Sequence, residues 1–132
     1  MNTNTYPNGL RYLFVLGALG ALVAGLPSVL LPDAVVGATG LSPQTVPVIQ
    51  QAGALALGFF VAGVMCWRAT MWAQVRISLV ASFVVFVLTA LGAFYYVVLL
   101  GVATPGLIAI LAAAVAMTIG FGFYLFKSMQ RA

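Results

Sequence analysis

Histidine is missing from this chain of 132 residues, and Asp33 is its only acidic side chain. Without histidine the chain cannot build a histidine-based catalytic triad, and it has no imidazole to ligate haem or a chlorophyll-type pigment. Cys66 is the one cysteine, so no disulfide can form within the chain. No metal ligand or base accompanies this thiol in the sequence. We therefore predict no catalytic site, no metal site and no cofactor, and hence a protein that is not an enzyme.

Charged residues are also scarce, at 5% of the chain, whereas soluble domains carry about 25%. Hydrophobic residues make up 64% of the chain, more than a water-soluble fold of this size can bury. The Lys and Arg residues give a net charge of +4 but are dispersed along the chain instead of forming a patch. We therefore expect an integral membrane protein that has the lipid bilayer as its surroundings and does not bind nucleic acid.

Four long apolar runs cover residues 10–31, 46–67, 75–100 and 105–126. Each reaches the roughly 20 residues that a helix needs to cross a hydrocarbon core of about 30 Å. A closed β-barrel is the other way to cross a bilayer, but these runs are too long for barrel strands and lack their alternation. The sequence predicts an all-α, four-transmembrane-helix bundle that forms a single membrane domain over residues 1–132.

The cations predict the orientation of the bundle, because cytoplasmic loops of membrane proteins are enriched in Lys and Arg. All of them fall at one end of the four predicted helices, and the opposite end has none. We expect both termini to be cytoplasmic (N-in/C-in), with the cations acting as topology and headgroup anchors. These anchors are Arg11, Arg68, Arg76, Lys127 and Arg131.

Aromatic residues agree with this orientation, since Trp and Tyr favour the level of the lipid headgroups. Tyr95 and Tyr96 are expected near the outer interface. Those expected near the cytoplasmic interface are Tyr12, Trp67, Trp72, Tyr124 and Phe126.

A cleaved signal sequence is the alternative interpretation of the first apolar run, since the small residues in 21–25 imitate a cleavage site. However, Arg11 is the single cation at the start of this run, and the run is long for a signal sequence. We therefore expect residues 10–31 to be a transmembrane helix.

The segment that joins the first two predicted helices, residues 32–45, is too apolar for a loop surrounded by water. Its prolines and glycines predict a short interfacial piece on the outer membrane face. Asp33 is expected to be a helix cap or interfacial anchor there, with an ion-attracting residue at a pore mouth as the alternative. Either Ser42 with Pro43, or the residues just before Pro47, start the second helix.

Prolines also mark two other boundaries. Pro27 is expected to kink the first helix or to end it early. Thr104 is expected to cap the fourth helix, with Pro105 at its first position.

Small residues recur every four positions on three of the predicted helices, and such faces let helix backbones approach closely in lipid. We expect them to pack inside the bundle, or to form a docking face for a membrane-protein partner or a second copy of the chain. The three sets are Gly17, Ala21 and Gly25; Ala54, Gly58 and Ala62; and Ala112, Ala116 and Gly120.

The polar side chains inside the predicted helices are few. Ser82, Thr89 and Thr118 are too sparse to define a continuous polar pathway. Hydroxyls in transmembrane helices also bond to their own backbone or to neighbouring helices, and we expect that structural role here.

Residues 16–68 combine a glycine-rich first helix, the outer segment LPDAVVGATGLSP, and a second helix that carries glycines. The motif residues of that second helix are Gln51, Gly53, Ala54 and Gly58, followed by Trp67 and Arg68. This stretch resembles small four-helix bacterial membrane proteins of a domain-of-unknown-function family. That family often has an arginine near the start of helix 2, where this chain has Gln50 or Gln51. The resemblance implies a bacterial origin, and hence the inner (cytoplasmic) membrane, but no activity.

Together these features predict a non-catalytic accessory or structural subunit that packs against a larger membrane complex of the respiratory or photosynthetic type. Its partner would be another membrane protein, or a second copy of the chain. A small homo-oligomeric channel or transporter is the alternative, because such proteins can work with hydroxyls and backbone carbonyls alone.

Overall fold

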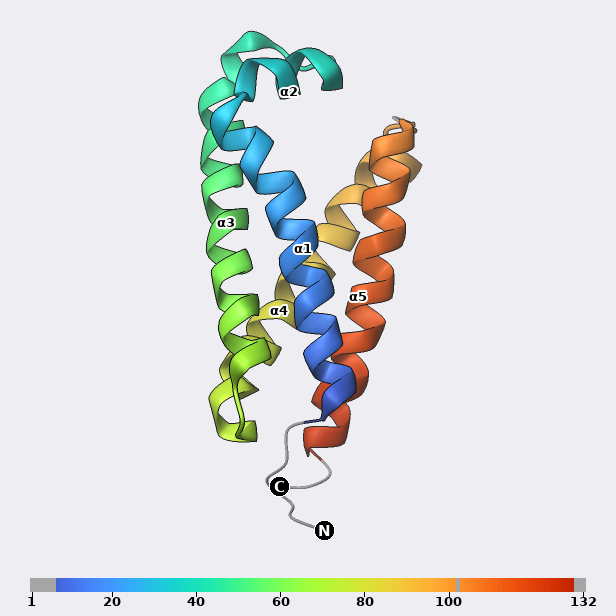
Figure 1. Cartoon of the computed structure of the whole chain (residues 1–132). Helices are drawn as coiled ribbons and strands as arrows, with labels where there is room; N and C mark the ends of the chain where they lie inside the picture. The colour runs from blue at the N-terminus through green and yellow to red at the C-terminus, as the bar shows by residue number, and fades with distance from the viewer. Residues whose placement is uncertain (1–6, 102, 130–132) are drawn as a thin grey trace. The chain divides into compact units, whose positions relative to one another are not determined.

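The computed structural model describes residues 7–101 and 103–129, which are almost entirely helical. Within them, four helices are long and apolar enough to cross a membrane (Figure 1). They are α1 (Asn8–Leu30), α3 (Val46–Arg68), α4 (Trp72–Phe94) and α5 (Pro105–Met129). The structure therefore supports the all-α prediction and the class of multi-pass membrane proteins.

Three shorter elements complete the described part of the chain. The helix α2 (Pro32–Thr39) and the 3₁₀-helix η1 (Pro43–Thr45) join α1 to α3. A π-helix, η2 (Tyr95–Leu99), extends α4 toward the turn before α5. The predicted interfacial piece at residues 32–45 is thus mainly a short helix followed by one 3₁₀ turn.

The contacts divide the chain into two compact units. The α1–α3 unit covers Phe14–Arg68 and holds most of α1 together with α2, η1 and α3. The α4–α5 unit holds the start of α1, up to Leu13, with the described residues from Ala69 onward. The single membrane domain over residues 1–132 stays a prediction.

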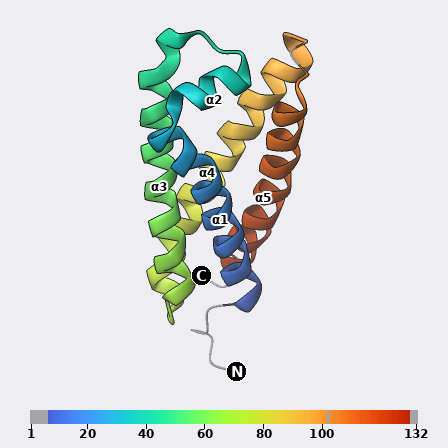
Figure 2. The same ribbon diagram turned by 45° about the horizontal axis from the view of Figure 1, so that its top comes forward.

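In the α1–α3 unit, α1 and α3 run in opposite directions, and α2 lies at the end where they are joined (Figure 2). Pro32 and Val36 are the buried residues of α2. Gly40 ends this helix with a φ of 69°, a left-handed conformation that suits glycine because it has no Cβ. The chain can therefore turn sharply from α2 into η1 and α3.

In the α4–α5 unit, α4 and α5 form an antiparallel pair, and the rings of Phe86 and Phe121 stack with their centroids 5.6 Å apart. One series of buried and half-buried residues of α5 alternates at spacings of four and three, the pattern of a helix that packs along one face. This series comprises Leu107, Leu111, Ala114, Thr118, Phe121, Leu125 and Ser128.

Two helix starts show the capping expected from the sequence. The hydroxyl oxygen of Thr104 accepts a hydrogen bond from the Leu107 N–H at 3.2 Å, and α5 begins at Pro105. The hydroxyl oxygen of Ser42 accepts one from the Gln44 N–H at 3.4 Å, and η1 leads directly into α3. The 3₁₀ turn η1 thus starts at Pro43 behind Ser42, whereas α3 itself starts at Val46, directly before Pro47, so each of the two starts left open begins one of these elements.

Pro27 does not end α1, which continues to Leu30. The Leu31 N–H donates to the Pro27 carbonyl at 2.8 Å, so the helical pattern resumes directly after the proline. The Ser28 hydroxyl donates to the Ala24 carbonyl at 2.7 Å. Transmembrane helices tolerate an internal proline, and α1 accordingly continues past Pro27 to Leu30.

Candidate interaction surfaces

The acidic and thiol side chains, Asp33 and Cys66, lie on different helices. Over residues 7–101 and 103–129, no group of three or more His, Cys, Asp or Glu side chains could hold a metal ion. Asp33 is exposed in the first turn of α2, where a negative charge interacts favourably with the helix dipole. Cys66 is buried in the α1–α3 unit, with 4% of its surface exposed. The candidate functional features of the described residues are therefore sought on the helix surfaces.

Glycines bring α1 and α3 into close contact. A Cβ added to Gly25 would lie 2.9 Å from the Gly53 carbonyl oxygen, and one added to Gly53 would lie 2.9 Å from that of Gly25. Farther along the pair, a Cβ on Gly63 would lie 2.8 Å from the Ala18 Cβ and 3.0 Å from the Phe14 carbonyl oxygen. Such close backbone approach is how small residues stabilise helix pairs in lipid.

The sets of small residues predicted on α1 and α3 take part in this contact only in part. Gly25 is buried in it, whereas Gly17 and Ala21 are half-buried. On α3, Ala54 and Gly58 are exposed and Ala62 is half-buried. A Cβ on Gly58 would meet nothing within 4 Å.

Sequence reasoning missed Gly53 and Gly63 as contact residues. They are ten residues apart, close to three helical turns, and therefore share a face of α3. Glycine content alone would not have identified this face, because Gly58, the third glycine of α3, is exposed.

A face of small residues follows α5 on the side away from Ala114 and Phe121. Apart from the adjacent Ala112 and Ala113, its members are spaced by three or four residues, and all are exposed except for the half-buried Gly120. We call this the small face of α5, and it consists of Gly106, Ala109, Ala112, Ala113, Ala116 and Gly120. It contains the whole set predicted on this helix.

The end of the small face at Gly120 is in contact with another segment of the α4–α5 unit. A Cβ on Gly120 would lie 3.0 Å from each of two side-chain carbons of Leu13, in α1. One turn farther along, a Cβ on Gly9 would overlap the Tyr124 hydroxyl. The start of α1 thus lies against Gly120 and Tyr124, while the part of the small face from Gly106 to Ala116 stays exposed.

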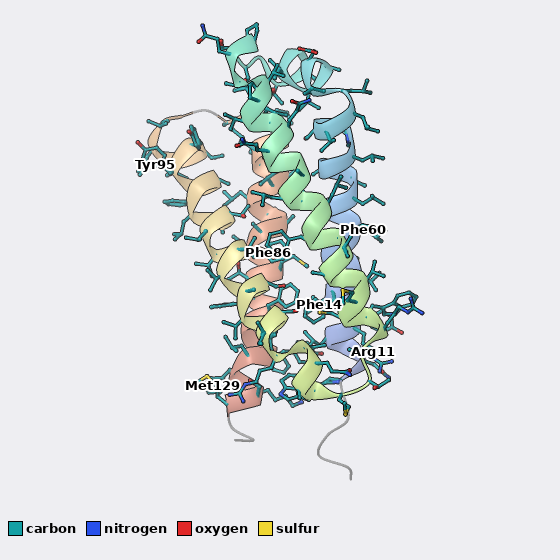
Figure 3. The ribbon with its side chains drawn as sticks, turned by 90° about the vertical axis from the view of Figure 1, so that its left-hand side faces the viewer. Arg11, Phe14, Phe60, Phe86, Tyr95 and Met129 are labelled. Carbon is teal, nitrogen blue, oxygen red and sulfur yellow. The ribbon has the colours of Figure 1, made fainter. Side chains whose placement is uncertain are left out.

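Cations gather at one end of the α4–α5 unit, at the start of α4 and the end of α5. The Arg11 Nη2 donates to the Ala69 carbonyl at 3.1 Å, which ties the start of α1 to the residues before α4. Arg76 is exposed near the start of α4, and Lys127 is exposed in the last turn of α5. Figure 3 shows Arg11 at the end where Met129 lies and Tyr95 at the opposite end.

Two of the predicted anchors remain, Arg68 and Arg131. Arg68 is the last residue of α3 and directly precedes Ala69. Arg131 lies outside the described residues. The amide oxygen of Gln74 accepts from the N–H groups of Thr70 and Met71, at 3.1 and 3.3 Å, and so fixes the start of α4. This cap was not expected from the sequence.

Exposed aromatic rings accompany the cations. Tyr12 is 70% exposed and Trp67 is 53% exposed, one residue from Arg11 and Arg68 respectively. At the other end of α4, Tyr95 and Tyr96 pack edge to face in η2, with ring centroids 5.8 Å apart. Aromatic rings at both ends of a long apolar helix are typical of membrane-spanning segments.

Comparisons with protein-family models, curated proteins and solved structures give no match to this chain. The resemblance of residues 16–68 to the four-helix bacterial family stays a prediction.

Proposed function

We propose that this chain is a non-catalytic accessory or structural subunit that packs against a larger membrane complex, of the respiratory or photosynthetic type, through the small face of α5. The observation that carries the proposal is the exposure of this face from Gly106 to Ala116. At Gly120 the same face contacts the start of α1, through Leu13. A helix of the partner would pack on the exposed part of the face, in the same way as α1 packs against Gly120.

The physics of helix association in lipid favours such a face. Apolar side chains gain little by leaving acyl chains, so helices associate where small residues allow the backbones to approach and collect dispersion contacts. A Cβ on Gly106 would meet nothing within 4 Å, so the upper end of the face has space for a neighbouring helix. Large residues elsewhere on α5, such as Ile119 and Phe126, are suited to contact with lipid.

The polar inventory of the sequence supports a non-catalytic role. With no histidine and one acidic side chain, the chain lacks the pairs of groups that acid–base or nucleophilic catalysis uses. We place the protein in the inner membrane of a bacterium, with both termini cytoplasmic. The cations at one end of the chain support this orientation through the positive-inside rule.

The test is purification of the tagged chain from native membranes at its natural level in a mild detergent, with mass spectrometry of the proteins that migrate with it. The proposal expects stoichiometric subunits of one membrane complex. The Ala112→Leu variant should lose these subunits, whereas the matched variant Ala81→Leu, at an exposed alanine of α4, should retain them. Recovery of the unaltered chain without any other membrane protein would contradict the proposal.

A homo-oligomeric channel or transporter is the second candidate, and one observation on α4 favours it. Ser78, Ser82 and Thr89 are spaced by four and seven residues, which places their hydroxyls on one side of the helix. Two of them, Ser78 and Ser82, are half-buried. The Thr89 hydroxyl donates to its own helix at the Val85 carbonyl, 2.8 Å away, which weakens the case for a continuous polar path.

A flux assay in liposomes separates the two candidates. The channel or transporter hypothesis expects conductance or uptake of small ions or solutes that falls when Ser78 and Ser82 are both replaced by alanine. The accessory-subunit proposal expects no flux above that of empty liposomes, with or without these substitutions.

A further inference from the structure

Two neighbouring glutamines, Gln50 and Gln51, lie in the first half of α3, and both are exposed. α3 continues the 3₁₀ turn η1, and together they form a candidate membrane span of 26 residues, Pro43–Arg68. Gln51 lies about 7 Å along the helix axis from the middle of this span. A hydrocarbon core of about 30 Å extends about 15 Å to either side of its middle. The Gln51 amide is therefore at a depth where lipid tails surround an exposed side chain.

An amide in hydrocarbon needs a hydrogen-bond partner from protein, because lipid tails offer none. The hydroxyls of Ser28 and Thr89 solve this problem locally, by donating to carbonyls of their own helices. The Gln51 side chain makes no such bond with any of the residues that the structure describes. Its donors and its acceptor are therefore available to a partner outside the described chain.

Small residues follow Gln51 on the same side of α3. Gly58 and Ala62 come 7 and 11 residues later, close to two and three helical turns. This side lies opposite Gly53, which is buried against α1. Gly58 is exposed, and a Cβ added to it would meet nothing within 4 Å. A helix from outside can therefore approach the backbone of α3 closely enough to bond with the Gln51 amide.

Gln50 lies on a different side of α3, followed at the same spacings by the larger Leu57 and Val61. A Cβ added to Gly25 of α1 would lie 3.1 Å from the Leu57 Cγ, so this side borders the α1–α3 contact. Val61 is 54% exposed and would hold a neighbouring helix away from the backbone. Of the two amides, Gln51 is thus the one placed for close helix packing.

We propose that Gln51 pairs with Gln51 of a second copy of the chain, across a two-fold axis along the membrane normal, with Gly58 allowing the two α3 helices to approach. Copies inserted in the same direction hold the same residue at the same depth, so a residue at this axis meets its own counterpart. An amide both donates and accepts and is therefore complementary to itself, unlike a carboxylate or an ammonium group. This proposal concerns α3, goes beyond the subunit role of α5 and does not depend on it.

The experiment measures pairing of the full chain in phosphatidylcholine liposomes. Copies labelled at the N-terminus with a donor or an acceptor dye are mixed, and energy transfer is followed as the protein-to-lipid ratio is raised. We expect transfer to saturate at the level of a dimer. Gln51→Leu should raise the ratio for half-maximal pairing roughly tenfold, because it removes both amide hydrogen bonds of the symmetric pair.

Gln50→Leu is the matched control, since it makes the same chemical change in the same helical turn, and it should leave the ratio for half-maximal pairing unchanged. Gly58→Leu keeps the amide but holds the two helices apart, and it should raise this ratio as Gln51→Leu does. All three residues are exposed, so the variants should fold, which circular dichroism checks. An unaltered chain that stays monomeric at every ratio, or equal effects of Gln50→Leu and Gln51→Leu, would overturn the proposal.

Discussion

Gly25 of α1 and Gly53 of α3 face each other so closely that a Cβ added to either would lie 2.9 Å from the carbonyl oxygen of the other. The obstacle in both directions is backbone, which cannot move aside as the end of a flexible side chain can. Both residues are buried. The α1–α3 pair therefore depends on the absence of side chains at these two positions.

Replacing Gly53 by alanine should destabilise the protein despite the higher helix propensity of alanine. The new Cβ would also lie 2.7 Å from the Ser28 Cβ, and overpacking of this kind costs about 1–3 kcal/mol. Gly58→Ala is the matched control, because a Cβ there meets nothing within 4 Å. Denaturant unfolding in detergent micelles measures both variants. Equal stability of the two would show that the α1–α3 contact is looser than described.

Phe121→Ala should weaken the α4–α5 unit strongly. Phe121 is 1% exposed and stacks on Phe86, and deletion of a buried phenylalanine ring costs about 3–5 kcal/mol. Phe126→Ala removes the same atoms from a position that is 64% exposed, and it should change stability by less than about 1 kcal/mol. The comparison uses thermal unfolding followed by circular dichroism. Equal destabilisation by Phe126→Ala and Phe121→Ala would contradict the packing of Phe121 in the interior of the α4–α5 unit.

The hydrogen bond from Arg11 to the Ala69 carbonyl predicts a stability loss for Arg11→Gln of about 1–3 kcal/mol, the range for a hydrogen bond that involves a charged group. Arg76→Gln removes an equal charge from an exposed side chain and should leave stability nearly unchanged. Unfolding free energies of both variants in the same micelles provide the test. A larger loss of unfolding free energy for Arg76→Gln than for Arg11→Gln would contradict the role given to the Arg11 hydrogen bond.

The cap at the start of α5 predicts that Thr104→Ala costs about 1 kcal/mol, because the Leu107 N–H loses its side-chain acceptor. Thr89→Ala is the matched control. Its hydroxyl donates to a carbonyl of its own helix that already belongs to the helical pattern, so this loss should be nearly neutral. Hydrogen exchange at Leu107 should accelerate in the first variant and stay unchanged in the second.

Much of the fold follows from the sequence, for physical reasons that act locally. Apolar runs of about 20 residues allow few alternatives to a membrane-crossing helix, and hydroxyl and proline residues such as Thr104 and Pro105 mark helix starts. The π-helix η2 could not be predicted, because nothing in the run around Tyr95 and Tyr96 distinguishes it from an ordinary helical turn. The cap formed by the Gln74 side chain could not be predicted either, because it depends on where the amide oxygen lies in the folded chain.

The surfaces were harder to predict than the helices. A four-residue spacing of small side chains predicted faces on α1, α3 and α5, and on α3 it drew attention to Ala54 and Gly58, which are exposed. Which face of a helix meets its neighbour depends on the crossing of the two helices and on partners distant in the sequence. For this reason Gly53 and Gly63 became identifiable only from the structure.

The central claim, that the small face of α5 docks a membrane-protein partner, is tested most directly by photo-crosslinking in native membranes. A photoreactive amino acid replaces Ala116 on this face in one variant and the exposed Ala81 of α4 in the other. The account predicts that the Ala116 position yields one discrete crosslinked protein, identified by mass spectrometry as a subunit of a larger complex, whereas the Ala81 position yields mainly lipid adducts. Crosslinking of Ala116 to lipid alone would contradict the claim.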